Sequence, residues 1–298
     1  MKSYLAVDIG GTFVKSGMVR ENGEIVATHK VKTPKTLDDL LHTIQAFCHS
    51  RPGVAGIAIS CPGAVSDDGV VYGSSAIPYI HGPSVKKLVE RRTALPVFVE
   101  NDANCAGYAE MWKGSARGKK DVLVMVIGTG IGGSVFKNGL LHKGANLHGG
   151  EFGYMLLTPD VQDSNDVWSR VASTKALVRK VAKMKQMNPD SILGEDIFKM
   201  AESGDQACIQ AIDAFYHLLA VGIYNLQYIY DPEIILIGGG ISAKEDLIDE
   251  IDERLDRILE KIDLAKVKPK IEPCKFRQNA NLLGAVYGFM LEHQNREL

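Results

Sequence analysis

The chain has 298 residues, which is more than a typical single domain holds, so we expect two domains. Apolar residues make up 45% of the sequence and charged residues 23%, an ordinary globular composition. The 34 basic residues are balanced by 36 acidic ones, for a net charge of −2, so the whole chain offers no general attraction for nucleic acid or an anionic membrane. We therefore expect neither as a partner.

The N-terminal sequence and the cysteines bear on where the protein works. The apolar stretch in MKSYLAVDIGG is too short for a signal peptide, and we expect no bilayer-spanning run. The five cysteines are an odd number without a CxxC pair, which is typical of reduced thiols. The eight histidines show no HExxH or other metal spacing. These features predict a cytoplasmic protein.

Short apolar strands and amphipathic helices alternate along the chain, which predicts an α/β protein. In the first half we expect strands at 4–7, 14–19, 25–31, 54–60 and 97–99, and helices at 37–48, after Ser84 and at 102–112. In the second half we expect strands at 122–127, 134–136 and 234–237, and helices at 209–229 and 282–290. Ser242 and Glu245 have the spacing of a capping box, so we also expect a helix to start there.

An internal repeat divides the chain. VDIGGTFVKSG near the N-terminus and IGTGIGGSVFKNG in the middle share one layout of strand, glycine turn, strand, lysine and glycine. This pattern predicts two halves built on one plan, each with a glycine turn. The best boundary between them is 114–120, where small and basic residues separate an apolar helix from an apolar strand.

The first glycine turn has the composition of an anion site. Gly10 and Gly11 lack side chains, so backbone N–H groups there can approach a phosphate closely. Thr12 adds a hydroxyl, Lys15 adds a cation, and Asp8 could hold Mg²⁺ through water. The alternative is a tight hairpin that merely needs glycine.

The second glycine turn formally matches GxGxxG at Gly128, Gly130 and Gly133. A dinucleotide site of this type needs a helix directly after the glycines, whereas a strand is expected here, so we reject that interpretation. The GxxxxGK[ST] pattern of P-loop proteins does not occur in the sequence. We interpret Gly128, Thr129, Gly130 and Gly132 as a second phosphate-binding turn.

A third glycine group follows the strand expected at 234–237. Gly239 and Gly240 allow close approach of a flat ligand, or of a phosphate to the N-terminus of the next helix. The alternative is a strand–helix junction that needs room.

Two carboxylates are candidates for the acceptor side of the site. Asp102, after Asn101 at the start of a helix, fits a general base that accepts the proton of a sugar hydroxyl, or else an N-cap. Asn101 could fix neighbouring hydroxyls. Glu151, in a glycine-rich segment, fits a carboxylate that accepts hydrogen bonds from two sugar hydroxyls, or else a solvent-exposed loop acid. Trp168 is interpreted as a packing residue.

Six segments together resemble the ROK family of sugar kinases and repressors. They are DIGGTFVK at 8–15, SCPGAV at 60–65, ENDANCAGYAE at 100–110, IGTGIGG at 127–133, GGEFG at 149–153 and PEIILIGGGIS at 232–242. The resemblance implies a two-domain α/β actin-like ATPase (ribonuclease H-like) fold with a central cleft that holds ATP. It also implies that the last helix packs on the first domain, giving domains of 1–117 plus 280–298 and 118–279.

The resemblance also assigns roles to residues. Asp102 is similar to the catalytic base, and Asn101, Asp102, Glu151, Tyr154 and Gly63 fall on the sugar side. The three glycine segments, with Asp8, Thr12 and Lys15, fall on the nucleotide side. The implied partners are a small sugar, ATP with Mg²⁺ and, as a family expectation, a second copy of the chain.

Several departures from the family pattern bear on the substrate. Tyr154 stands where many members have histidine, and 155–173 contains no cysteine, so we expect no structural zinc. Ser169 and Ala76 stand in place of a common glutamate and asparagine of the sugar site. We therefore expect a kinase that phosphorylates the 6-hydroxyl of a β-glucoside or other hexose. The alternatives are an N-acetylmannosamine kinase, or another N-acylhexosamine kinase, and a glucokinase.

Two other classes of function compete with this one. Family repressors carry an N-terminal helix-turn-helix, for which this chain, beginning almost directly with a strand, leaves no room. A sugar-binding protein without catalysis is the third possibility, and the presence of Asp102 argues against it.

Overall fold

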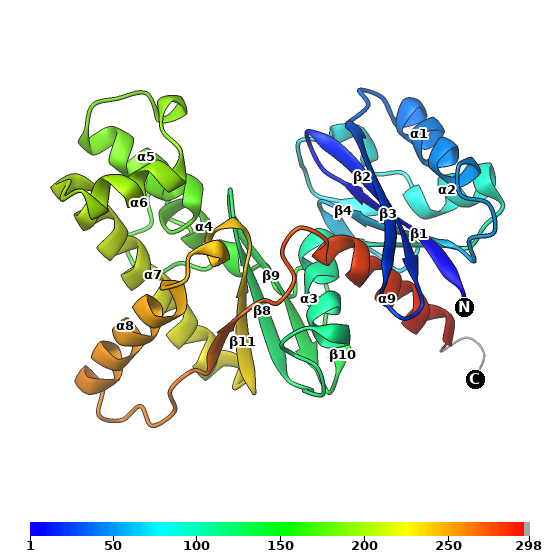
Figure 1. Ribbon diagram of the computed structural model, residues 1–298. Coiled ribbons are helices and arrows are strands. Elements are labelled where there is room, and N and C mark those ends of the chain that lie inside the picture. Colours follow the sequence, from blue (N-terminus) through cyan, green and yellow to red (C-terminus); the bar gives the residue numbers. More distant parts are fainter. Residues whose placement is uncertain (295–298) are drawn as a thin grey trace. The chain divides into compact units, whose positions relative to one another are not determined.

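The computed structural model describes residues 1–294, which fold into two compact α/β units (Figure 1). The first unit contains Met1–Gly118, Leu141–Gly149 and the chain from Lys275 onward, and the second contains Lys119–Leu140 and Gly150–Cys274. The expected domains differ from this grouping at Gly118 and at two short segments, 141–149 and 275–279, all of which group with the first unit.

Each unit is built on a five-stranded sheet, and the two sheets have the same plan. The first runs β3-β2-β1-β4-β7 and the second β10-β9-β8-β11-β12. In the first sheet β1, β2 and β3 form an antiparallel meander, and β4 and β7 add in parallel next to β1. In the second sheet β8 and β9 pair antiparallel, and β11 and β12 add in parallel next to β8. The layout repeated in the sequence is therefore a repeated hairpin at the start of each sheet.

The strands have the following bounds. In the first unit they are β1 (Ser3–Ile9), β2 (Phe13–Arg20), β3 (Ile25–Lys32), β4 (Ile57–Cys61), β7 (Val97–Asn101) and the small pair β5 (Ala64–Val65) and β6 (Val71–Tyr72). In the second they are β8 (Val122–Ile127), β9 (Ile131–Lys137), β10 (Leu140–Leu141), β11 (Ile234–Gly238) and β12 (Ile271–Pro273), with Leu141 itself grouped with the first unit.

Helices cover both faces of the first sheet. One face packs on α1 (Leu37–His49) and α2 (Val85–Thr93), and the other on α3 (Asp102–Lys113) and α9 (Ala280–Gln294). Because successive strand residues point to opposite faces, Leu5 and Val7 enter the first core while Tyr4 and Ala6 enter the second. A strand buried on both faces has a continuous apolar sequence, and this is the pattern that predicts β1.

The second unit has one large core around α7 (Gln206–Tyr230). Its other helices are α4 (Trp168–Val171), α5 (Thr174–Met184), α6 (Gly194–Glu202) and α8 (Leu247–Lys261). By length and composition α7 would pass as a bilayer-spanning helix, contrary to the sequence expectation that no such run exists. Its buried residues belong to the core of this unit, which is the setting of a central helix in a globular protein.

The helix expected to start at Ser242 begins later. Residues Gly240–Ala243 form a short 3₁₀ turn, and α8 starts at Leu247 after Asp246. The Ser242 hydroxyl donates to the Gly239 carbonyl at 2.8 Å, so it is not used as a helix cap. The capping-box prediction was therefore wrong.

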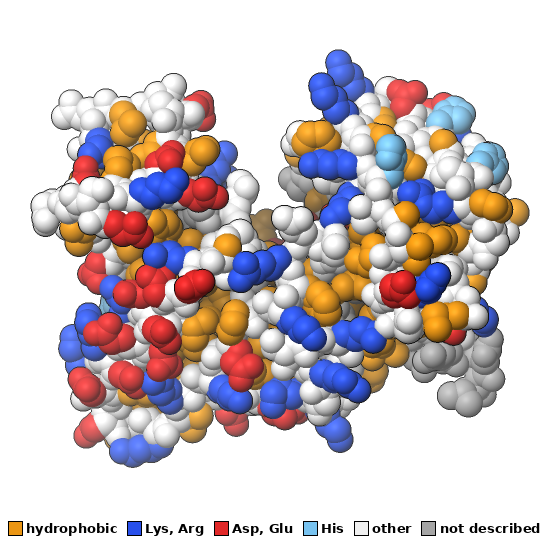
Figure 2. Space-filling model, in the orientation of Figure 1, with side chains coloured by type: hydrophobic (Ala, Val, Ile, Leu, Met, Phe, Trp, Pro, Cys, Tyr) orange, Lys and Arg blue, Asp and Glu red, His pale blue; other side chains and the backbone are white. Residues whose placement is uncertain are grey.

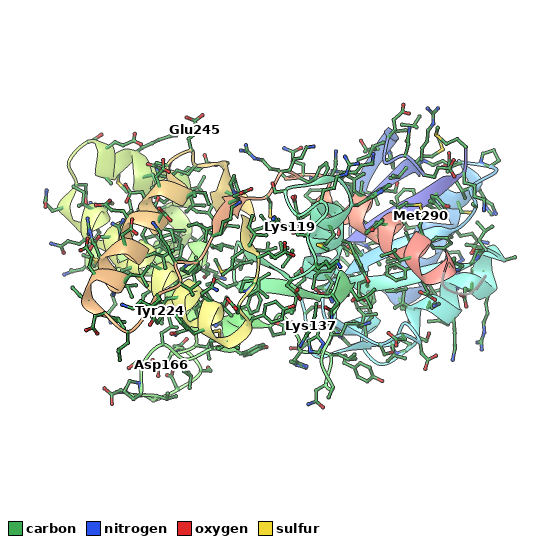
Figure 3. All side chains as sticks on the ribbon, turned by 90° about the horizontal axis from the view of Figure 1, so that it is seen from below. Lys119, Lys137, Asp166, Tyr224, Glu245 and Met290 are labelled. Carbon is green, nitrogen blue, oxygen red and sulfur yellow. The ribbon has the colours of Figure 1, made fainter. Side chains whose placement is uncertain are left out.

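The segment between Met155 and Trp168 is an exposed loop with its own hydrogen bonds. Asp166, labelled in Figure 3, accepts from the backbone N–H groups of Gln162 and Asp163, at 2.7 and 3.1 Å. These bonds lower the pKa of the Asp166 carboxyl. The Asp166 carboxylate therefore holds one turn of the loop, and the loop contains no cysteine.

Charges of both signs are interspersed on the surface. Figure 2 shows acidic and basic side chains side by side over the part of the face that α8 forms. Several of them pair, including Arg257 with Glu253 at 2.5 Å and Lys268 with Asp252 at 2.7 Å. This mixture produces no single-sign field over α8.

Candidate active site

Three polar residues of the first unit stand in register at the carboxyl ends of its parallel strands. Asp8 of β1 pairs with Ser60 of β4, and Ser60 pairs with Glu100 of β7. In open α/β sheets, ligands bind outside the carboxyl ends of the strands. Of the three, the sequence predicts only Asp8 as a site residue.

Asp8 is held by two side chains. Its Oδ1 accepts from the Ser60 hydroxyl at 2.9 Å and from Asn281 Nδ2 of α9 at 3.1 Å. Burial raises the pKa of Asp8, and the hydrogen bonds from Asn281 and Ser60 and the Lys15 charge oppose that rise. The carboxylate is therefore fixed at one oxygen in a setting that penalises its charge, as suits a group that meets a cation on binding.

Lys15 lies across the hairpin from Asp8, with which it pairs in the β1–β2 register. Its ammonium donates to the Gln278 carbonyl at 3.0 Å and to Asn279 Oδ1 at 2.5 Å. Both acceptors precede α9, so Lys15 fixes the start of that helix. An ammonium has three donors, so two bonds still leave one for a phosphate.

The first glycine turn is a closed hairpin. Gly10 N–H donates to the Phe13 carbonyl at 3.0 Å, and Thr33 donates from its hydroxyl to Gly10 and from its N–H to Thr12. A Cβ at Gly11 would lie 2.9 Å from the Ala76 methyl group. The turn therefore packs directly against Ala76.

Asn101 and Gly63 are joined by a hydrogen bond. Asn101 Nδ2 donates to the Gly63 carbonyl at 3.0 Å, while its Oδ1 accepts from the N–H groups of Ala103 and Asn104. Asn101, not Asp102, is thus the N-cap of α3. Gly63 has φ of +105°, a conformation that favours glycine.

Asp102 is the first residue of α3 and is half-buried. Its Oδ1 accepts from the N–H of Ala103 at 2.8 Å. The N-cap alternative for Asp102 is excluded because Asn101 has that role, and a carboxylate in the first turn is favoured by the helix dipole.

Glu100 and Lys143 form an ion pair that the sequence did not reveal. Glu100 is 3% exposed, and its Oε2 lies 3.1 Å from Lys143 Nζ. Its other oxygen accepts from Asn101 N–H at 2.7 Å and from Asn104 Nδ2 at 3.0 Å. The pair fixes the segment containing Lys143 to the start of α3. In the sequence Glu100 stands out only as a neighbour of Asp102, and nothing around Lys143 points to it.

The second unit holds the Gly128–Gly130 turn between β8 and β9. Gly128 N–H donates to the Gly130 carbonyl at 2.8 Å, and the Gly128 carbonyl accepts from Thr174, the first residue of α5, at 3.0 Å. Thr129 at its tip is exposed, and Gly132 lies in β9 directly after it. The strand after the turn agrees with the rejection of a dinucleotide site.

Glu151 and Tyr154 lie at the two ends of a short 3₁₀ turn, Phe152–Tyr154. Among the side chains of residues 1–293, none forms a hydrogen bond or ion pair with the Glu151 carboxylate, and Tyr154 is 69% exposed. The glycines on either side are packed tightly on β9: a Cβ at Gly150 would lie 2.5 Å from the Gly133 carbonyl oxygen, and one at Gly153 would lie 2.2 Å from that of Ile131. This packing holds Glu151 beside the second glycine turn.

The third glycine group ends β11. Gly239 has φ of +91°, and a Cβ there would lie 2.1 Å from the Ile127 carbonyl oxygen at the end of β8. Gly239 and Gly240 are both exposed. The two glycine groups of the second unit are therefore neighbours at the ends of adjacent parallel strands.

The predicted residues thus form two sets. Asp8, the first glycine turn, Lys15, Gly63, Asn101 and Asp102 belong to the first unit. The other two glycine groups, Glu151 and Tyr154 belong to the second. Within the part of the chain that the structure describes, no cluster of three or more His, Cys, Asp or Glu side chains could hold a metal ion.

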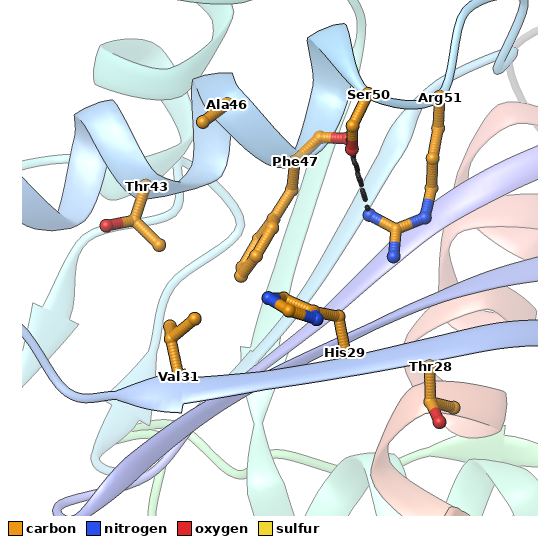
Figure 4. A pocket seen from close by; sticks show the side chains of 8 residues that line it. All are labelled: Thr28, His29, Val31, Thr43, Ala46, Phe47, Ser50 and Arg51. Atoms are coloured by element: carbon orange, nitrogen blue, oxygen red, sulfur yellow. Dashed lines mark hydrogen bonds between the residues drawn. The ribbon is translucent and has the colours of Figure 1, made fainter.

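A separate cavity of about 550 Å³ lies between β3 and α1 (Figure 4). His29 and Phe47 meet there edge to face at a ring distance of 5.8 Å, and Arg51 borders one side. No predicted site residue lines this cavity, so it does not bear on the site described above.

Comparison with known proteins identifies the family. The ROK family pattern matches residues 4–291. A β-glucoside kinase of Listeria monocytogenes is 36% identical, covering 98% of this chain and 99% of its own, and one of Klebsiella pneumoniae is 34% identical, covering 95% of both. A solved ROK family protein from Streptococcus pneumoniae, in complex with sucrose, has a TM-score of 0.92 at 36% identity and covers 98% of this chain and 99% of its own.

The fold agrees with that of a further solved relative. A ROK family glucokinase from Streptomyces griseus, in complex with glucose and AMPPNP, has a TM-score of 0.78 at 28% identity, covering 95% of this chain and 97% of its own. The chain belongs to the ROK family. It has the actin-like ATPase fold, and it is a carbohydrate kinase.

Proposed function

We propose that this kinase transfers the γ-phosphate of ATP to the 6-hydroxyl of a β-glucoside or related hexose. The observation that carries the proposal is the similarity, over nearly the whole chain, to β-glucoside kinases of three organisms at 34–36% identity. The relative bound to AMPPNP, an ATP analogue, supports ATP as the donor.

Asp102 is the proposed general base. A sugar hydroxyl is a weak nucleophile, and a carboxylate that accepts its proton assists attack on the γ-phosphorus. The N–H of Ala103 and the start of α3 fix the Asp102 carboxylate, and Asn101 and Gly63 lie within one hydrogen bond of each other beside it. Glu151, without a protein partner among the described residues, is the proposed acceptor for other sugar hydroxyls.

The glycine groups are the proposed contacts for the nucleotide, together with Thr12 and Lys15. Mg²⁺ bound with ATP would neutralise charge that develops on the phosphates. Asp8 is the residue that would hold it through water, because Mg²⁺ keeps most of its waters and uses few carboxylates. The hydrogen bonds to one Asp8 oxygen leave the other for such a water.

Two positions favour a substituted sugar. Ala76 is a small residue against the first glycine turn, and Tyr154 presents a largely exposed ring next to Glu151. A small side chain in place of an amide removes polar contacts to the sugar and leaves room for a substituent. This argument favours a β-glucoside over free glucose.

A substrate panel tests the proposal. Purified protein with ATP and Mg²⁺ would be assayed against cellobiose, an aryl β-glucoside, glucose and N-acetylmannosamine by coupled ADP release. We expect the highest kcat/KM for a β-glucoside, with the phosphate on the 6-hydroxyl by NMR of the product. A higher kcat/KM for glucose or for N-acetylmannosamine would replace the proposed substrate by that sugar, and no turnover with any sugar would refute the proposal.

The alternative functions and substrates have less support. The named curated relatives favour a kinase and not a repressor. An N-acetylhexosamine remains the second substrate class, since an N-acetyl-D-glucosamine kinase of Photobacterium profundum is 29% identical over 95% of this chain. We further propose that the protein acts in the cytoplasm as a homodimer, which fractionation of cells and analytical ultracentrifugation would test.

A further inference from the structure

Ser169, the second residue of the short helix α4, contacts the Gly128–Gly130 turn of the second unit. Its Oγ accepts a hydrogen bond from the backbone N–H of Ile131 at 2.9 Å. A Cβ at Gly130 would lie 2.7 Å from the same oxygen, and no other atom would come within 4 Å of it. From outside the β8–β9 hairpin, the Ser169 hydroxyl therefore contacts one side of the turn, while the Thr174 N–H donates to the Gly128 carbonyl on the other.

The same side chain touches the segment that carries Glu151. A Cβ at Gly153 would lie 2.9 Å from Ser169 Cβ. The glycine therefore allows the backbone of 150–153 to lie directly on Ser169. One serine thus contacts both the turn proposed for the phosphates and the segment proposed for the sugar.

The position of Ser169 is fixed from the core. Its neighbour Trp168 is fully buried and packs on α7 at Gly222, where a Cβ would lie 2.1 Å from the indole Cζ2. The backbone N–H of Trp168 donates to the Met155 carbonyl at 2.7 Å. Because the Trp168 indole is tightly packed, Ser169 cannot shift without moving this core residue.

We propose that Ser169 is a positioning residue that couples nucleotide binding to sugar binding. Whichever ligand orders the 128–130 turn or the 150–153 segment also orders the other through this shared contact, so each ligand strengthens the binding of the other. This inference rests on the proposed function for its choice of ligands, but the contacts themselves do not depend on it.

The first test measures the coupling. Binding of AMPPNP would be measured by calorimetry with and without a saturating sugar that the panel shows to be a substrate. We expect wild type to bind AMPPNP at least about fivefold more tightly with sugar, and Ser169→Ala to bring the ratio close to one. Ser84→Ala is the matched control, because that hydroxyl also accepts from a backbone N–H, of Lys87, but caps α2 in the first unit. It should keep the wild-type ratio.

Hydrogen exchange separates this inference from the proposed function. In wild type, AMPPNP alone should slow amide exchange at 150–154 as well as at 128–131, and in Ser169→Ala the effect at 150–154 should disappear. This readout needs no sugar, so it holds if no sugar is turned over. A coupling ratio or an exchange pattern unchanged in Ser169→Ala would overturn the proposal.

A double variant distinguishes loss of the Ser169 contact from misfolding of the Ser169→Ala protein. Gly130→Ala should weaken AMPPNP binding about tenfold, because the added methyl group would disturb the part-buried hydrogen bond between the Ile131 N–H and Ser169. In the Ser169→Ala background the added methyl group meets no oxygen, so the two losses should combine to less than their product. Independent effects of the two substitutions would contradict the assigned contact.

Discussion

The Ser60 hydroxyl donates to the Asp8 carboxylate at 2.9 Å, between residues that pair directly across β1 and β4. This bond joins the end of the first strand to the next parallel strand, and Asn281 adds a bond from α9 to the same oxygen. Asp8 is therefore held in a fixed position, and burial disfavours its charged form and raises its pKa.

Replacing Asp8 should change how stability depends on pH. Because the pKa of Asp8 is raised on folding from its usual 3.8, the folded state holds the proton at pH values where the unfolded state has lost it. The free energy of unfolding should therefore fall as pH rises from the usual value through the raised pKa. In Asp8→Asn this component should be absent.

The measurement is urea unfolding of both proteins between about pH 4 and 7. Asp8→Asn should lose its dependence on Asp8 titration and also most of its activity, if Asp8 holds the metal-bound water. Asn281→Ala, which removes one stabilising bond to the carboxylate, should steepen the wild-type trend. A wild-type stability that rises over this window because of Asp8 would contradict the expected sign.

Breaking the Glu100–Lys143 pair should be costly. Glu100 is almost fully buried, so Lys143→Met leaves a buried charge without its cation, and we expect a loss of about 3 kcal/mol in unfolding free energy. The loss should be much smaller in a Glu100→Gln background, since no charge is then left unpaired. Lys143 also lies 3.3 Å from Asp67, but that carboxylate is fully in solvent and should matter little.

Urea unfolding of the four proteins in this double-variant cycle gives the interaction energy. Asp67→Asn is the control for the exposed partner and should stay within about 0.5 kcal/mol of wild type. Equal losses from Lys143→Met in both backgrounds would show that Lys143 acts through packing alone.

Asp102→Asn should abolish most turnover while leaving the fold intact. The amide oxygen can still accept from the Ala103 N–H, but the side chain can no longer take a proton. We expect kcat to fall by about 10²–10⁴ with a KM for sugar within a few-fold of wild type. Steady-state kinetics and thermal unfolding of the same preparation check both parts, and undiminished kcat would remove Asp102 from the mechanism.

Gly222→Ala should destabilise the second unit although alanine is the better helix former. The added methyl group would lie 2.1 Å from the buried Trp168 ring, and overpacking of this kind costs about 1–3 kcal/mol. Trp168→Phe, which shortens the ring, should relieve part of the loss in the double variant. A Gly222→Ala protein with a higher Tm than wild type would show that the indole can move.

Much of the fold was predictable because its signals are local. Most strands of the two sheets and helices α1, α3, α7 and α9 follow from apolar periodicity, whereas the short edge strands β10 and β12 were not predicted. Ser84 caps α2 by accepting from the N–H of Lys87, as expected. The start of α8 was misplaced because the Ser242 hydroxyl bonds to Gly239 instead of capping the helix. Helices α5 and α6 are not among the elements predicted from the sequence, and both pack on the central helix α7 in the core of the second unit.

The sequence by itself determined the α/β class and the glycine and carboxylate segments, because each depends on residues close together in the chain. Six such segments in their order along the chain also indicated the family. Only the tertiary structure brought Ser60 and Asn281 to Asp8, Lys143 to Glu100, and Ser169 to the second glycine turn. These pairs are separated by many residues, and no periodicity encodes which strand ends meet. The sequence alone therefore predicts a turn at residues 8–12, whereas the pKa of Asp8 depends on how the sheet and α9 pack around it.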